Sequence, residues 1–146
     1  MQTPEQKSRI VREAHRLLKP GGRYGIHELC LIPNDLDDST KLAIRNELSS
    51  VIHHGTRPLT IAEWQGLLES EGFSVQEHAQ AAMHLLEPWR IIQDEVILGA
   101  LRFAFNLLRN RQARRRVLAM RRVFSTYRDH LAAVMLIGQK KEEVPQ

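Results

Sequence analysis

Hydrophobic and polar positions over residues 3–18 alternate with the period of an α-helix. The segment opens with Thr-Pro-Glu-Gln at 3–6, an N-cap followed by proline at the first helical position and by a glutamine that can complete a capping box. The pattern predicts one buried apolar stripe with charged residues turned toward water. The inward set is Ile10, Val11, Ala14, Leu17 and Leu18, and the outward set is Lys7, Arg12, Glu13 and Arg16.

A proline-glycine turn at 20–22 ends this helix, because proline disfavours helical backbone at the residue before it and glycine accepts positive φ. A strand is predicted next, from Arg23 to Ile32. From Ile26 onward this strand is apolar on both alternations, which is typical of a strand covered on both faces.

The rest of the chain continues the alternation of helices and strands. The predicted elements are a helix from about Leu42 to Ile52, a helix from Thr60 to Gly72 with a second capping box, a strand from Phe73, a helical region from Pro88, a helix over Ala113–Tyr127 and a strand over Leu131–Ile137. The last apolar run is short enough for a central strand. We therefore expect an α/β fold with three strands and about five helices.

Composition places the chain among globular proteins of one domain. It has 146 residues, of which 42% are hydrophobic and 26% charged, with a net charge of +4. The single cysteine, Cys30, forms no internal disulfide, which agrees with a reducing compartment, and no apolar run approaches the ~20 residues of a membrane span. We expect a cytoplasmic protein without a membrane span.

Three segments carry a resemblance to a known family. They are EAHRLLKPGGRYGIHEL at 13–29, TIAEWQGLLESEGFSV at 60–75 and a late apolar strand that ends in GQKK at 138–141. In this order they resemble the carboxy-terminal half of class I S-adenosylmethionine-dependent methyltransferases of the small-molecule type. The resemblance implies the last part of a Rossmann-like sheet: residues 23–32 match the fifth strand, 73–82 the sixth, and 131–138 the seventh, which runs antiparallel between the other two.

The resemblance covers only part of such an enzyme. Family members bind the cofactor with a glycine-rich loop after the first strand and an acidic residue at the end of the second. No G-x-G pattern precedes a helix in this sequence. We therefore expect residues 1–146 to form a single partial domain that lacks the first four strands, binds no S-adenosylmethionine alone and is inactive alone.

The open sheet edge implies partners. The strand at 23–32 would present an unpaired edge where the family's fourth strand belongs, and such edges pair with other chains. We expect self-association or a complementing amino-terminal half, and a small-molecule substrate in the complete enzyme.

Candidate substrate-binding residues lie near the carboxyl end of the first strand, where open α/β sheets bind ligands. His27, Glu28 and Cys30 are there, although neighbours on a strand point to opposite faces, so His27 and Glu28 cannot form one dyad. Packing is the alternative role for all three.

A second candidate group, His53, His54 and Arg57, lies between two predicted helices. Imidazoles there could shape a substrate pocket or act as a base near neutral pH, and helix capping is the alternative. No third ligand at a metal-binding spacing accompanies the histidines, so we expect no metal site. No catalytic residue is identified.

Arginines dominate the predicted helical insertion at 87–130. Eight lie between Arg109 and Arg128, and no acidic residue separates them. They suggest an alternative function, a non-catalytic interaction module that binds a polyanion or a protein through the basic helix 109–128 or the open sheet edge. Nucleic acid is not the favoured partner, since few aromatic residues accompany the arginines. Retention on heparin that collapses in moderate salt would distinguish polyanion binding from a solvated helix face.

Overall fold

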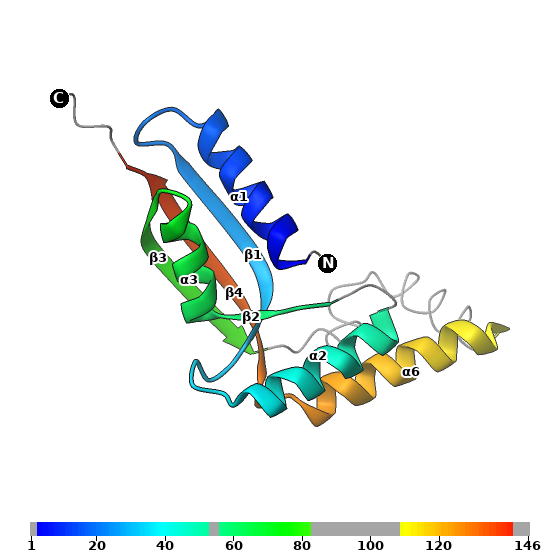
Figure 1. Cartoon of the computed structure of the whole chain (residues 1–146). Helices are drawn as coiled ribbons and strands as arrows, with labels where there is room; N and C mark the ends of the chain where they lie inside the picture. The colour runs from blue at the N-terminus through cyan, green and yellow to red at the C-terminus, as the bar shows by residue number, and fades with distance from the viewer. Residues whose placement is uncertain (1–2, 53–55, 83–108, 142–146) are drawn as a thin grey trace.

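A four-stranded mixed sheet forms the centre of the molecule (Figure 1). The computed structural model describes residues 3–52, 56–82 and 109–141. The strands are β1 (Arg23–Leu31), β2 (Leu59–Thr60), β3 (Phe73–Ala82) and β4 (Leu131–Lys140), in the order β2-β1-β4-β3. β4 is antiparallel to both of its neighbours, so the expected mixed sheet with an antiparallel last strand is confirmed.

The predicted strand count of three is wrong, because the described residues include a fourth strand. β2 pairs in parallel with the carboxyl end of β1, with Cys30 opposite Leu59 and Leu31 opposite Thr60. Two residues are too few to show a hydrophobic alternation, so no periodic signal marks this strand in the sequence. β2 covers only the last part of the β1 edge that we expected to be open.

Four helices lie within the described residues: α1 (Pro4–Leu17), α2 (Asp38–Ile52), α3 (Ile61–Ser70) and α6 (Arg111–Thr126). Both predicted capping boxes are present, with Thr3 and Gln6 at the start of α1 and Thr60 and Glu63 at the start of α3. The helical region expected from Pro88 lies outside the described residues, as does the part of the 87–130 insertion before residue 109.

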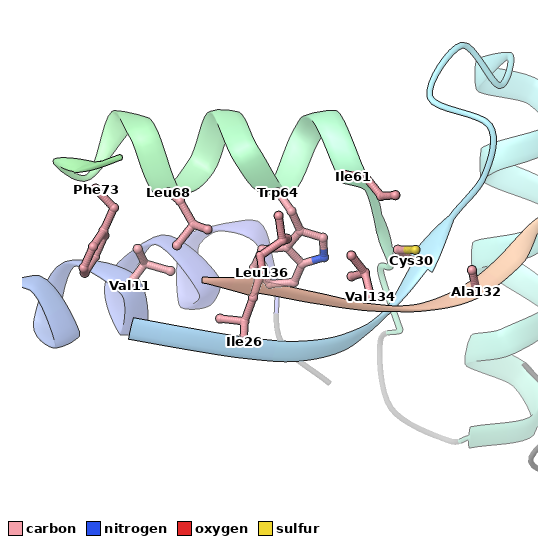
Figure 2. Packing of buried hydrophobic residues seen from close by; sticks show 10 residues of the cluster. All are labelled: Val11, Ile26, Cys30, Ile61, Trp64, Leu68, Phe73, Ala132, Val134 and Leu136. Atoms are coloured by element: carbon pink, nitrogen blue, oxygen red, sulfur yellow. The ribbon is translucent and has the colours of Figure 1, made fainter. Parts of the chain in front are cut away.

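One hydrophobic cluster joins α1 and α3 to the same face of the sheet (Figure 2). Val11 from α1, Trp64 and Leu68 from α3, and Phe73 at the start of β3 meet the inward residues of β1 and β4. Burial of these side chains from two helices and three strands fixes both helices over one face. The fully buried members include Leu68, Phe73, Val134 and Leu136.

A second cluster lies where β1 ends and β4 begins. There α2 and α6 lie side by side (Figure 1), and Ile44, Leu48 and Val123 pack with Leu31 and Leu131. Phe124 and Tyr127 pack against this cluster, and the Tyr127 hydroxyl donates to Glu47 Oε1 at 2.9 Å. The apolar face of α6 therefore serves as core.

The glycine turn between α1 and β1 is structural. Gly21 has φ of 76°, and a Cβ on Gly22 would lie 2.8 Å from the Lys19 carbonyl oxygen. The Lys140 ammonium donates to the carbonyl oxygens of His15 and Leu18, which fixes the end of α1 against the end of β4.

Candidate functional site

A cavity of about 260 Å³ lies between α1 and β1. Its walls include five consecutive β1 residues, 24–28, which alternate between the two faces of the sheet. A cavity that contacts residues from both faces lies along the edge of the strand. The rest of the wall consists of Lys7, Ile10 and Val11 of α1 and of Trp64 of α3. We call this cavity the edge pocket.

Lys7 is the buried cation of the edge pocket. Only 4% of this residue is exposed. Its ammonium donates to the Arg57 carbonyl oxygen at 2.6 Å and lies 4.7 Å from the centre of the Trp64 ring. Burial lowers the pKa of Lys7, while the negative charge of Glu28 acts in the opposite direction.

The prediction that Lys7 faces water is therefore wrong. Positions 7, 11, 14 and 18 form the helical stripe that faces the core, and Lys7 begins it. Conversely, Leu17 is 71% exposed and Ile10 is 41% exposed, although both belong to the predicted inward set. These two residues lie seven positions apart, so they share one side of α1.

Trp64 brings an unpaired donor to the same place. Among the described residues, its indole nitrogen, Nε1, is the one buried side-chain polar atom without a hydrogen-bond partner, and Trp64 is 3% exposed. Figure 2 shows the indole directed from α3 toward the strands, near Ile26 and Leu136. A buried donor without an acceptor is destabilising and calls for an explanation.

The sequence-predicted residues on β1 occupy three different environments. His27 is exposed, and its register partner on β4 is the exposed Met135. Glu28 is half-buried and lines the edge pocket. The pKa of Tyr24 is raised mainly by burial, and the negative charge of Glu28 raises it further. His27 and Glu28 thus belong to opposite faces, as strand alternation requires.

Cys30 is a core residue. It has no exposed surface and belongs to the cluster between the sheet and α3. Burial raises the pKa of its thiol, which keeps the neutral form. A fully buried side chain offers no surface to a substrate, so we assign Cys30 to packing and not to substrate binding.

Of the second candidate group, only Arg57 lies within the described residues. Its side chain is exposed, and its backbone carbonyl holds Lys7 beside the edge pocket. His53 and His54 lie outside the described residues. The structure therefore brings Glu28 and Arg57 to the neighbourhood of Lys7, a residue that the sequence analysis did not select.

The arginines of α6 remain on its surface. Arg111, Arg115 and Arg122 are exposed and lie on one side of the helix, spaced four and seven residues apart. Within the part of the chain that the structure describes, Arg128, which follows the end of α6, forms an ion pair with the adjacent Asp129. The helix therefore has an inner face that packs on α2 and an outer face of positive charge.

The described residues do not fit the cofactor that the family resemblance implies. Gly21 and Gly22 precede β1 and Gly72 precedes β3, whereas a cofactor loop follows a strand and opens a helix. Gly22 is crowded by backbone rather than open to a ligand.

Two other features are absent from residues 3–52, 56–82 and 109–141. These residues contain no helix long and apolar enough to span a membrane, and no group of three side chains placed to bind a metal ion.

Lys7 gives a pH-dependent prediction. Because the folded-state pKa of Lys7 is lowered by burial, the unfolded chain binds more protons at alkaline pH. The contribution of Lys7 to the free energy of unfolding therefore rises as pH increases toward the ordinary lysine pKa of about 10.4. Lys7→Met, which keeps the buried stem without the charge, is expected to lose that gain. Urea unfolding across this pH range measures it, with the exposed Lys19→Met as control. A Lys7→Met profile parallel to that of the wild type would contradict the buried cation.

Comparison with known proteins gives the fold its context. No model of a known protein family matches the chain. An uncharacterised protein of Haemophilus influenzae is 30% identical over 127 residues, which cover 86% of this chain and 46% of that protein. The chain thus spans about half the length of this curated relative.

Solved structures share the arrangement of strands and helices. The MccD protein has 22% identity and a TM-score of 0.60, with 97% of this chain and 55% of that one covered. A Geobacter sulfurreducens methyltransferase with S-adenosylhomocysteine has 14% identity and a TM-score of 0.54, covering 86% and 49%. Haemonchus contortus phosphoethanolamine N-methyltransferase 2 with S-adenosylmethionine has 16% identity and a TM-score of 0.58, with 92% of this chain and 30% of that one covered. The chain therefore has the fold of S-adenosylmethionine-dependent methyltransferases, over about half the length of the first two structures.

Proposed function

We propose that this chain is the carboxy-terminal portion of an S-adenosylmethionine-dependent methyltransferase that acts on a small molecule. The observation that supports this most is the sheet itself, in which the last strand, β4, lies antiparallel between β1 and β3. The similarity to cofactor-bound methyltransferases adds to it. A small acceptor is favoured by the name of one similar structure, a phosphoethanolamine methyltransferase.

The cofactor-binding strands would come from polypeptide outside residues 1–146. The described residues lack a glycine-rich loop between a strand and a helix, so we expect no cofactor binding and no methyl transfer by this chain alone. Methyl transfer depends on alignment of the acceptor and exclusion of water more than on acid-base groups. What these residues would contribute is a rigid sheet and acceptor positioning.

Acceptor positioning would fall to polar residues near the carboxyl end of β1. Glu28 lines the edge pocket with Lys7, the Arg57 backbone accepts from the Lys7 ammonium, and His27 is exposed on the other face. Carboxylate and guanidinium groups could orient a polar or charged acceptor. We include His53 and His54 in this proposal from their place in the sequence only.

A labelling experiment tests the small-molecule proposal. The chain is combined with the segment of the Haemophilus influenzae relative that it does not match, then supplied with methyl-labelled S-adenosylmethionine and a cell extract. We expect label in the low-molecular-weight fraction, and less of it with Glu28→Gln. Label only in protein or nucleic acid, or none above a heat-inactivated control, would contradict the proposal.

The alternative function, a non-catalytic interaction module that uses α6, is tested by the heparin experiment described under the sequence analysis.

A further inference from the structure

The outer side of α6 carries positive charge that no acid neutralises. The residues that share about one third of the helix circumference form what we call the basic face: Arg111, Arg114, Arg115, Leu118, Arg121 and Arg122. Within residues 3–52, 56–82 and 109–141, no ion pair joins these arginines to a carboxylate, whereas Arg12, Arg16 and Arg45 on α1 and α2 each pair with a glutamate. The charge of the basic face is therefore available to an anionic partner.

The hydrophobic core holds α6 so that the basic face points outward. Val123 and Phe124 lie on the opposite side of the helix, where they pack with α2 and with the adjacent ends of β1 and β4. Figure 1 shows α2 and α6 side by side, extending beyond the sheet at the margin of the molecule. From Arg111 to Arg122 the basic face is about 17 Å long. It is a narrow, straight surface directed to solvent.

Leu118 indicates which kind of anionic partner fits. It lies in line with Arg115 and Arg122 and is 54% exposed, in the centre of the basic face. A large aliphatic side chain adds little to the binding of a purely polar polyanion. The surface of a phospholipid bilayer offers both complements, because phosphates lie at the level of the guanidinium groups and acyl chains lie just below them. Guanidinium groups also bind phosphate oxygens through paired hydrogen bonds.

Nucleic acid fits the basic face less well. Single strands bind basic surfaces through bases that stack on aromatic side chains. The aromatic residues of α6 and of its carboxyl end, Phe124 and Tyr127, pack against the cluster where β1 ends and β4 begins, and neither belongs to the basic face. An anionic bilayer is therefore the partner that both the charge and Leu118 favour.

We infer that the basic face of α6 is a membrane-contact surface, which holds the chain against a bilayer that contains anionic phospholipids. The helix lies parallel to the bilayer plane, the guanidinium groups contact lipid phosphates, and the Leu118 side chain enters the boundary between headgroups and acyl chains. This contact needs no helix that crosses the bilayer. It goes beyond the proposed methyl transfer and does not depend on it.

The test is sedimentation of the complete chain with vesicles. Vesicles of equal parts phosphatidylglycerol and phosphatidylcholine are compared with vesicles of phosphatidylcholine alone. We expect binding to the anionic vesicles that weakens as salt is added, and little binding to the neutral ones. Each arginine near an anionic leaflet strengthens binding by about fivefold, so the double variant Arg115→Gln/Arg122→Gln should bind about tenfold or more weakly. The control Arg9→Gln/Arg23→Gln removes the same charge from exposed positions outside α6 and should have a much smaller effect.

Leu118→Gln separates a bilayer from other polyanions. It should weaken vesicle binding by about threefold or more and leave retention on heparin unchanged, because only the bilayer offers an apolar layer. Leu42→Gln is the matched control, since Leu42 is 59% exposed but belongs to α2. Circular dichroism verifies that all variants fold.

Several outcomes would overturn the inference. They are equal binding to anionic and neutral vesicles, equal losses for the two double variants, no effect of Leu118→Gln on vesicle binding, and binding to heparin or RNA without binding to vesicles. The labelling experiment is read independently. Vesicle binding by a chain that supports no methyl transfer would leave the membrane-contact surface standing and refute the proposed function.

Discussion

Phe73→Ala is expected to lower the free energy of unfolding by about 3–5 kcal/mol, the usual cost of truncating a buried aromatic side chain. Phe73 has no exposed surface and begins β3. Its ring stacks on Tyr24 at 5.6 Å between centroids and meets the edge of His15 at 5.1 Å. The substitution therefore removes contacts that join α1, β1 and β3.

Urea unfolding followed by circular dichroism measures this loss. The Leu17→Ala variant is the control, because Leu17 is 71% exposed and its truncation is expected to change stability by only about 0.5 kcal/mol. Phe73→Leu should fall between the two, since it keeps much of the buried volume. If Phe73→Ala cost no more than Leu17→Ala, the packing of α1 on the sheet described above would be wrong.

Trp64→Ala is expected to have the second large effect, again about 3–5 kcal/mol, because the indole fills the space between α3 and the strands. Trp64→Phe should cost far less, about 1.5 kcal/mol or below. It keeps an aromatic ring in the core and removes a buried donor that has no partner, which offsets part of the lost contact area.

A double-mutant cycle with Lys7→Met isolates the contact of the ammonium with the ring. A coupling of about 0.5–2 kcal/mol is expected for a cation over an aromatic face at a buried site. The same urea unfolding experiment provides it. Equal losses for Trp64→Ala and Trp64→Phe would show that the ring does not fill the core as described. No coupling to Lys7 would show that the cation does not contact the ring.

The helices and long strands could be predicted because each has its own local signal. Thr3 and Thr60 begin α1 and α3 with capping boxes, and the apolar runs of β1 and β4 have strand length. β2 has two residues and exists only through its pairing with β1, so nothing local marks it. The full burial expected for β1 holds only toward its carboxyl end, because His27 and Gly25 face a side that no described element covers.

The candidate site was less accessible from sequence. Glu28 could be selected from its place on a strand. The charge of Lys7 predicts a solvent-facing side chain, although its spacing from Val11 and Ala14 puts it on the inward stripe of the helix. Trp64 has the pattern of a core residue, and nothing in the sequence reveals that its indole nitrogen lacks an acceptor. Cys30 is the opposite case: it is a reactive residue type near a strand end, and the structure places it in the core, which is the alternative role that the sequence left open.

Calorimetric titration of S-adenosylhomocysteine tests the central claim most directly. It is carried out first with the chain alone, then with the chain and the unmatched segment of the Haemophilus influenzae relative, and then with that segment alone. We predict no binding to the chain alone and saturable binding to the combination, tighter than to the segment by itself. Saturable binding to the chain alone would contradict the account, because the cofactor would then be held by residues that we assign to packing and to the open edge.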